Sequence, residues 1–319
     1  MKNCLFIALI LLFACGKQGK QKKLSQVSEE VQSNVALYIL GTVQDAGSPH
    51  IDCQKECCSA LFEHPDTGRK VVSLGVVDHE NGKSFLFEAT PDMSAQLRLL
   101  KGFSGKNTDI PDGIFLTHAH MGHYTGLMYL GREAKGANQV PVYAMPKMKS
   151  FLETNGPWDQ LVTLNNIVLS EIQDQTSLKL TSNISVVPMI VPHRDEYSET
   201  VGYKIVGPNK SILFIPDIDK WHKWERSIVK EIEKVDLAFL DASFFNEKEI
   251  NNRDISEIPH PFVIESMKLF DELPAKEKAK VHFIHFNHTN PLLNPKSTES
   301  RLVQIQGFNV AKFQQKFGL

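Results

Sequence analysis

Short apolar runs alternate with longer mixed segments from residue 35 onward, and this pattern predicts strands and helices in turn. The predicted strands are Val35–Leu40, Val71–Val77, Ser84–Glu88, Gly113–Thr117, Val140–Ala144, Ile184–Val191, Thr200–Val206, Ser211–Ile215, Leu237–Leu240 and Val281–Ile284. The predicted helices are Gln96–Lys101, Thr125–Glu133, Trp224–Lys234, Pro261–Phe270 and Ser297–Ile305. Asn81-Gly82 lies between the second and third strands and predicts a tight hairpin.

Hairpins and helices therefore alternate twice along the chain. This order favours two sheets packed face to face with helices outside, in one domain over residues 35–319. Periodicity alone gives an α/β or α+β class and does not choose the topology.

The N-terminus has a different pattern. The apolar run Leu5–Phe13 is too short to span a bilayer as a mature helix but fits the core of a signal peptide. Residues 1–15 resemble a bacterial lipoprotein signal in which Cys15 receives the lipid, with an ordinary cleaved signal or an uncleaved anchor as the alternatives. Residues 16–34 are polar and predict a disordered tether. We therefore expect a protein of the bacterial cell envelope, attached to a membrane through its lipid, on the periplasmic or outer-surface side.

Composition is that of a soluble globular protein, with 42% hydrophobic residues and a formal net charge of -2. Without a basic surplus we expect a small-molecule substrate rather than nucleic acid. Of the five cysteines, Cys4 and Cys15 belong to the N-terminal signal, which leaves Cys53, Cys57 and Cys58 for the folded part. An odd number fits a disulfide framework poorly and favours a metal site.

The run Thr117-His118-Ala119-His120-Met121-Gly122-His123 carries three histidines and directly follows the apolar segment Ile114–Leu116. A strand that ends in such a loop can direct several imidazoles at one point, and neutral imidazole is a common zinc ligand. Three unrelated surface histidines are the alternative interpretation. The run predicts a metal site.

Four later strands also end in a residue that can bind a metal: His193, Asp217, Asp241 and His285. Strand ends give side chains a rigid support. Any one of these residues alone is more commonly an ordinary polar residue at a strand exit. Together with the histidine run, they predict a common centre.

The order of these residues resembles the metallo-β-lactamase superfamily. The resemblance implies an αββα sandwich in which His118, His120 and His193 hold one metal. It implies that Asp217 bridges to a second metal, which His123 and His285 also hold, and we take Asp217 and His285 as the catalytic residues. In such hydrolases a hydroxide between the two metals is the nucleophile.

A narrower resemblance covers about Leu40 to Phe313. The segments Tyr124-Thr125-Gly126-Leu127, Asp241-Ala242-Ser243-Phe244-Phe245 and Ile284-His285-Phe286-Asn287-His288 resemble the PQQ-biosynthesis protein B branch of the superfamily. That branch also resembles the phosphodiesterase of phosphonate breakdown and the tRNA-processing nucleases.

Gly122 departs from the family motif, which has an aspartate that binds the second metal at this position. We therefore expect the second metal to be weaker or absent, unless another side chain takes that place. Asp92, His79 and Asp241 are the candidates. A site with three ligands and an open position would still support mononuclear chemistry.

A separate structural metal is expected at Cys53, Cys57 and Cys58, since thiolates at this spacing can converge on zinc. The resemblance implies His288 as the fourth ligand. Adjacent thiolates strain a tetrahedral site, so one of Cys57 and Cys58 could be only a neighbour. Three buried thiols, or one disulfide plus a free thiol, are the alternatives.

Three functions are consistent with the predicted metal sites and the family resemblance. The first is a metal-dependent hydrolase of an ester, with a phosphodiester favoured, acting by attack of metal-bound hydroxide and using one or two Zn²⁺ ions in the histidine site plus one structural Zn²⁺. The second is a metal- and oxygen-dependent hydroxylase like PQQ-biosynthesis protein B, with iron or manganese in the histidine site. An exported protein fits that role poorly, because the PQQ precursor is modified inside the cell. The third is a non-catalytic metal-binding lipoprotein, which Gly122 favours.

Overall fold

The computed structural model describes residues 33–250 and 253–319. Residues 33–319 form one compact unit. The expected signal peptide, the lipid attachment at Cys15 and nearly all of the expected tether lie outside the described residues. Across the described ranges, no helix combines the length and the apolar character that a bilayer crossing requires.

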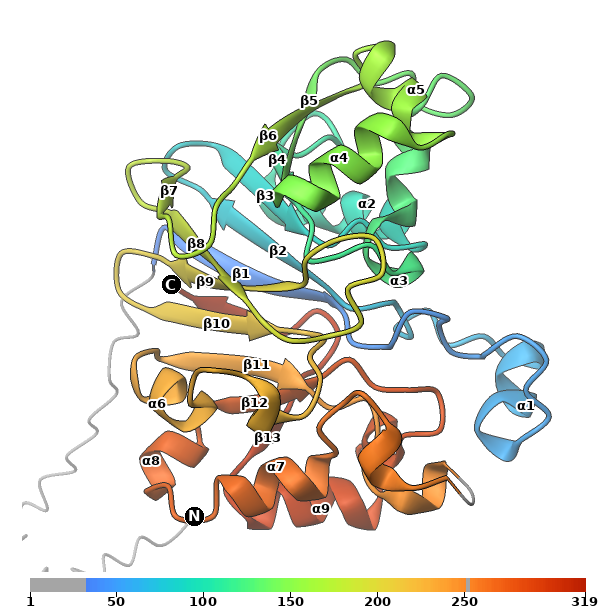
Figure 1. Cartoon of the computed structure of the whole chain (residues 1–319), viewed down its shortest axis with the longest axis vertical. Coiled ribbons are helices and arrows are strands. Elements are labelled where there is room, and N and C mark those ends of the chain that lie inside the picture. The colour runs from blue at the N-terminus through green and yellow to red at the C-terminus, as the bar shows by residue number, and fades with distance from the viewer. Residues whose placement is uncertain (1–32, 251–252) are drawn as a thin grey trace, which may run out of the picture. The chain divides into compact units, whose positions relative to one another are not determined.

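Two sheets of seven strands each form the centre of the fold (Figure 1). The first sheet has the order β14 (Lys316–Gly318), β1 (Val35–Gly41), β2 (Ser73–Asp78), β3 (Lys83–Phe87), β4 (Gly113–Phe115), β5 (Val140–Ala144) and β6 (Ile167–Glu171). The second sheet has the order β13 (Asn309–Val310), β12 (Val281–Ile284), β11 (Leu237–Asp241), β10 (Ser211–Ile215), β9 (Val201–Val206), β8 (Ser185–Ile190) and β7 (Leu178–Lys179). The β2–β3 hairpin pairs around Asn81-Gly82 as the sequence predicts.

Helices cover the outer face of each sheet (Figure 1). Beside the first sheet lie α2 (Met93–Ser104), α4 (Pro146–Thr154) and α5 (Trp158–Thr163). Beside the second lie α6 (Ile228–Glu233), α7 (Val263–Leu269), α8 (Ala275–Lys278) and α9 (Thr298–Ile305). The short α1 (Glu56–Glu63) projects beyond the edges of both sheets.

Three hydrophobic cores separate these layers. The central core joins the two sheets and includes Phe87 and Phe115 from the first sheet and Tyr203 and Phe239 from the second. Phe87 stacks on Phe115 at 4.7 Å between ring centroids. Two further cores lie between each sheet and its helices. Burial on both faces explains why most strands read as continuous apolar runs. The predicted αββα sandwich is confirmed.

Two predicted helices differ from the structure. In place of the helix predicted over residues 125–133, the structure has a shorter 3-10 helix, Thr125–Leu130, after the single turn α3 (Met121–Tyr124). The Gly126 N–H donates to the carbonyl of Ala89 outside the helix, which draws this segment against the end of β3. The helix predicted from Trp224 begins only at Ile228, because the Ser227 side chain accepts from the Lys230 N–H as an N-cap.

Strand direction brings the candidate site residues to one edge. β10, β11 and β12 are mutually parallel, and β8 runs the same way because it is antiparallel to β9, which is antiparallel to β10. The carboxyl ends of these four strands therefore lie at the same edge of the second sheet. Asp217, Asp241, His285 and His193 stand at or just after those ends.

Candidate metal centre

His118, His120, His193 and Asp217 converge on one point. The Nε2 atoms of His118 and His193 lie 3.3 Å and 3.2 Å from Oδ2 of Asp217. Nδ1 of His120 lies 2.9 Å from Nε2 of His118 and 3.3 Å from Nε2 of His193. Four ligands about 2.1 Å from a tetrahedral Zn²⁺ would stand about 3.4 Å apart, so these spacings fit a cation among them.

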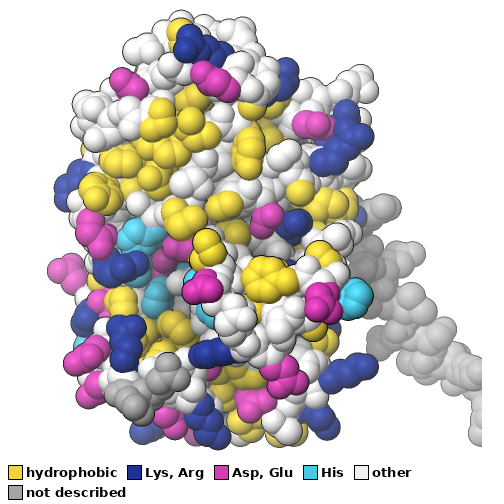
Figure 2. Space-filling model, turned by 90° about the vertical axis from the view of Figure 1, so that its right-hand side faces the viewer, with side chains coloured by type: hydrophobic (Ala, Val, Ile, Leu, Met, Phe, Trp, Pro, Cys, Tyr) yellow, Lys and Arg dark blue, Asp and Glu magenta, His cyan; other side chains and the backbone are white. Residues whose placement is uncertain are grey.

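A second group shares Asp217. It consists of Asp45, His123, Asp217 and His285. Oδ1 of Asp45 lies 2.9 Å from Nε2 of His123 and 3.4 Å from Nε2 of His285. Oδ2 of Asp217 lies 3.9 Å from Nε2 of His123, so this carboxylate faces both groups. Figure 2 shows histidine side chains gathered with acidic side chains on one face of the molecule.

Most of these imidazoles have their outward nitrogen held by an oxygen atom. Nδ1 of His118 is 2.9 Å from the Thr117 hydroxyl, and Nε2 of His120 is 3.1 Å from the Glu196 carboxylate. Nδ1 of His285 is 2.9 Å from the Ser243 hydroxyl. Nδ1 of His193 has no hydrogen-bond partner within the described ranges. Such outer partners fix the ring and leave the inward nitrogen free for a metal.

Glu88 faces the outward nitrogen of His123 as a charge partner rather than through a hydrogen bond, and the histidine motif does not mark it. It is fully buried, and its Oε2 lies 3.4 Å from Nδ1 of His123. Glu88 and His285 both have positive φ values, 78° and 69°. Such conformations cost about 1–3 kcal/mol each and concentrate at functional sites. The sequence signal that could have identified Glu88 is its position as a charged residue at the end of a buried strand.

His260, which lies just before α7, is a further residue of the site. Its Nδ1 lies 2.8 Å from Oδ2 of Asp241 and 3.1 Å from Oδ1 of Asp217. Asp241 also lies 3.4 Å from Nδ1 of His285. His260 thus fixes one oxygen of Asp217 and leaves the other facing the histidines.

The three candidates for the missing motif aspartate lie in different places. Asp92 accepts from Lys70 and from the Val71 N–H, and His79 is exposed, so neither joins the histidines. Asp241 is buried behind His260 and His285. Asp45, which the sequence analysis did not consider, is the carboxylate beside His123.

The electrostatics of the site favour a bound cation. Burial raises the pKa of Asp217, but the charges of His193 and His260 outweigh burial and hold this pKa well below its usual range. Burial lowers the pKa of His123, yet the charges of Asp45 and Glu88 raise it well above its ordinary value. His123 thus balances buried carboxylates with a proton, a positive charge that a divalent cation would supply instead.

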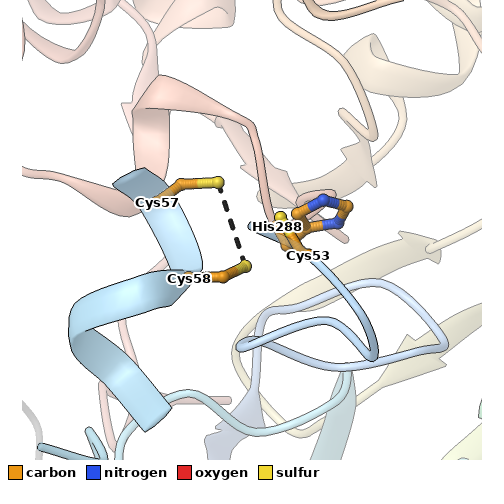
Figure 3. Close-up of side chains that lie close together, drawn as sticks. All are labelled: Cys53, Cys57, Cys58 and His288. Carbon is orange, nitrogen blue, oxygen red and sulfur yellow. Dashed lines mark hydrogen bonds between the residues drawn. The ribbon is translucent and has the colours of Figure 1, made fainter. Parts of the chain in front are cut away.

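The structure also brings the predicted cysteine cluster together. Cys57 and Cys58 lie on α1, Cys53 precedes that helix, and His288 comes from the segment after β12 (Figure 3). One ligand atom from each lies within 4.8 Å of the others. The three cysteines of the described chain are free thiols, and the 3.9 Å between the Cys57 and Cys58 sulfurs is too long for a disulfide.

Protonation in this cluster suits a metal-ligating histidine. Burial and the nearby charges of His50 and Lys55 lower the pKa of His288 to about 4, so its ring is neutral at neutral pH. Burial and the neighbouring thiols raise the pKa of Cys57 to about 12. A cation is what would hold such a group as a thiolate.

Comparison with known proteins places this geometry in a family. The pattern described as "Beta-lactamase superfamily domain" matches residues 83–283, which include both histidine groups except Asp45 and His285. The chain belongs to the β-lactamase superfamily. Within that superfamily it is similar to coenzyme PQQ synthesis protein B of Nitrosococcus oceani, with 25% identity over 307 residues, 86% of this chain and 97% of the relative. The Klebsiella pneumoniae protein of the same name is 24% identical over 86% of this chain and 94% of its own.

Several solved structures share the fold. Zn²⁺-bound PqqB from Methylobacterium extorquens has a TM-score of 0.72 and 19% identity, and the match covers 89% of this chain and all of that one. A diphosphatase of the PhnP family has a TM-score of 0.61 and 22% identity, over 89% and 96% of the two chains. Human tRNase Z has a TM-score of 0.54 and 15% identity, over 88% and 98%. The predicted branch, resembling PqqB and PhnP, is confirmed.

Proposed function

We propose that the protein is a metal-dependent hydrolase of an ester, with a phosphodiester as the favoured substrate class. The proposal rests on the two ligand groups that share Asp217. In these groups one ring nitrogen of each histidine faces the centre, and for most of the histidines the other nitrogen contacts an oxygen atom. Most superfamily members are hydrolases, which supports this class of reaction. When bound, a divalent cation lowers the pKa of a coordinated water and offsets negative charge on the reacting group.

The residues around the centre have separable tasks. His118, His120 and His193 would hold the first cation, and Asp217 would face both ligand groups. His260 keeps Asp217 in place through its 3.1 Å contact with Oδ1. Glu196 holds the outward nitrogen of His120 from a partly exposed position. These contacts orient ligand atoms before a cation or substrate arrives, which lowers the reorganisation that the reaction requires.

The cavity beside Asp45 is lined by charged side chains of both signs. A cavity of about 380 Å³ is lined by Asp45 and Met121 together with Arg69 and Lys70. Arg69 donates to the Ser48 hydroxyl and pairs with Asp66 at 3.5 Å, and Lys70 pairs with Asp92 at 3.2 Å, so carboxylates in the same cavity offset both cations. The preference for a phosphate ester therefore rests on the neighbours of the same fold. Neighbours of the same fold include a diphosphatase and a tRNase Z.

The test uses the full-length chain loaded separately with Zn²⁺, Mn²⁺ and Fe²⁺ and assayed against an aryl phosphodiester, a lactone and a thioester. We expect phosphodiester hydrolysis that a chelator abolishes. His120→Ala should remove the activity, and His64→Ala, which alters an exposed histidine on the same chain, should keep it. Absence of hydrolysis with every metal and every substrate would contradict the proposal.

A second candidate has its own support. The similarity to coenzyme PQQ synthesis protein B extends over 86% of this chain. Histidine sites with open positions serve iron as well as zinc. Oxygen consumption by the Fe²⁺-loaded protein, without hydrolysis, would favour a hydroxylase. We also propose the lipid attachment at Cys15, which mass spectrometry of the membrane-extracted protein would test.

A further inference from the structure

Gly122 lies against the loop that follows β1. A Cβ atom placed on Gly122 would overlap Cα of Asp45 and would stand 2.6 Å from its Oδ1 and 2.7 Å from its Cγ. Real Cβ atoms do not approach other atoms this closely. The volume that a side chain at position 122 would need is therefore taken by Asp45.

The position of Asp45 is fixed from both sides. The Gln44 N–H donates to the carbonyl of Phe286, and the Phe286 N–H donates to the carbonyl of Thr42, each at 2.8 Å. These bonds join the loop after β1 to the residue that directly follows His285. The two segments thus bring the Asp45 carboxylate and the His285 ring to the same place.

The atoms that face one another have the character of metal ligands. Nε2 of His123 and Nε2 of His285 both point at Oδ1 of Asp45, at 2.9 Å and 3.4 Å. Their Nδ1 atoms face Glu88 and Ser243. With Asp217, these groups provide two imidazoles and two carboxylates within 4.8 Å of one another, a donor set suited to Zn²⁺ or Mn²⁺.

We propose that Asp45 is a ligand of a second metal ion in the histidine site, and that Gly122 provides the space it needs. The carboxylate that the histidine motif lacks comes instead from a loop 77 positions earlier in the chain. The histidine site then holds two ions. The sequence motif alone, with Gly122 in place of an aspartate, predicts instead that the second ion is weak or absent. The inference concerns metal binding, so it stands or falls separately from the choice of substrate.

The experiment counts metal ions in the full-length chain after loading with Zn²⁺ and removal of excess metal. Wild type should hold three ions, one in the cysteine cluster and two in the histidine site. Asp45→Asn keeps the size of the side chain and should hold two. Gly122→Ala should also hold two, because the added carbon displaces the Asp45 backbone. Asp52→Asn is the matched control, since Asp52 is exposed in the same loop and makes the same change of charge.

Zinc titration adds a readout of strength. Removing a residue that only hydrogen-bonds to a metal ligand lowers metal affinity about 10- to 100-fold. Removing the Asp45 carboxylate, a ligand itself, should therefore lower the affinity for the second ion at least tenfold. Retention of the cysteine-site ion shows that a variant is folded. Two ions in wild type, or three ions in Asp45→Asn or Gly122→Ala, would overturn the inference. Three ions without hydrolysis of any ester would leave it intact and contradict only the proposed function.

Discussion

Replacing Glu88 by glutamine tests whether a buried carboxylate outside the ligand groups tunes the metal. Glu88 has no exposed surface, and its carboxylate oxygens make no hydrogen bond within the described chain. Its Oε2 lies 3.4 Å from Nδ1 of His123, close enough for an ion pair. Glutamine keeps the size and removes the charge. His123 then loses the partner that fixes its ring and makes Nε2 a better donor.

The expected magnitude follows from the role of such partners. Their loss lowers metal affinity about 10- to 100-fold, which corresponds to about 1.4–2.7 kcal/mol of binding free energy. The effect should fall on the ion beside His123 and Asp45. An ion held by His118, His120 and His193 would not depend on the His123 ring that Glu88 faces, and it should keep its affinity.

Isothermal titration calorimetry with Zn²⁺, followed by elemental analysis, would measure both ions. Glu133→Gln is the control, since the Glu133 side chain is 66% exposed and pairs with Arg132 on the surface. Equal affinities in wild type and Glu88→Gln would refute the role given to Glu88. Equal weakening of both ions would show that the two ligand groups do not act as separate sites.

Three further predictions follow. His120→Ala should remove metal from the histidine site and leave the cysteine cluster occupied, as elemental analysis would show; loss of both would contradict two separate sites. In the metal-loaded protein the three described thiols should resist a thiol reagent until a chelator is added, and immediate reaction would argue against a cysteine-bound ion. Burial raises the pKa of Asp78, but bonds from Thr181 and Asn81 outweigh it and hold this pKa below its usual value. Its stabilising contribution should therefore be complete above the unfolded pKa of about 3.9 and disappear as pH falls through the folded value. At neutral pH, Asp78→Asn should cost about 1.5–3 kcal/mol in chemical denaturation, and a loss that stays constant into acid would contradict this.

Strand exits were predictable because their signal is local. His118, His193, Asp217 and His285 each follow an apolar run, and the structure places all four at one centre. Burial on both faces of two sheets makes those runs continuous, which is what the sequence pattern detects. The β2–β3 hairpin was predictable for a similar reason, since Asn81-Gly82 specifies the turn.

Asp45 and the strand β14 could not be predicted from the sequence pattern. Asp45 lies in a polar turn with nothing around it to mark a ligand, and its partner His123 is 78 positions away. The only trace was a missing side chain at Gly122. β14 pairs with β1 across nearly the whole domain, Ala36 opposite Gly318, and its three residues, Lys316–Gly318, are too few to carry a strand signal. Both depend on contacts between distant segments, which local periodicity does not encode.

The backbone bonds between Gln44 and Phe286 have a consequence for how the two metal sites are assembled. The same two stretches of chain continue to Cys53 on one side and to His288 on the other, so a zinc ion in the cysteine cluster closes them into a ring. Asp45 lies inside that ring and His285 directly precedes the residue that closes it, Phe286, whereas His118, His120 and His193 belong to other segments. Dependence between the sites should therefore run in one direction. Oxidation of the thiols would loosen half of the histidine centre, while emptying that centre would leave the ring closed.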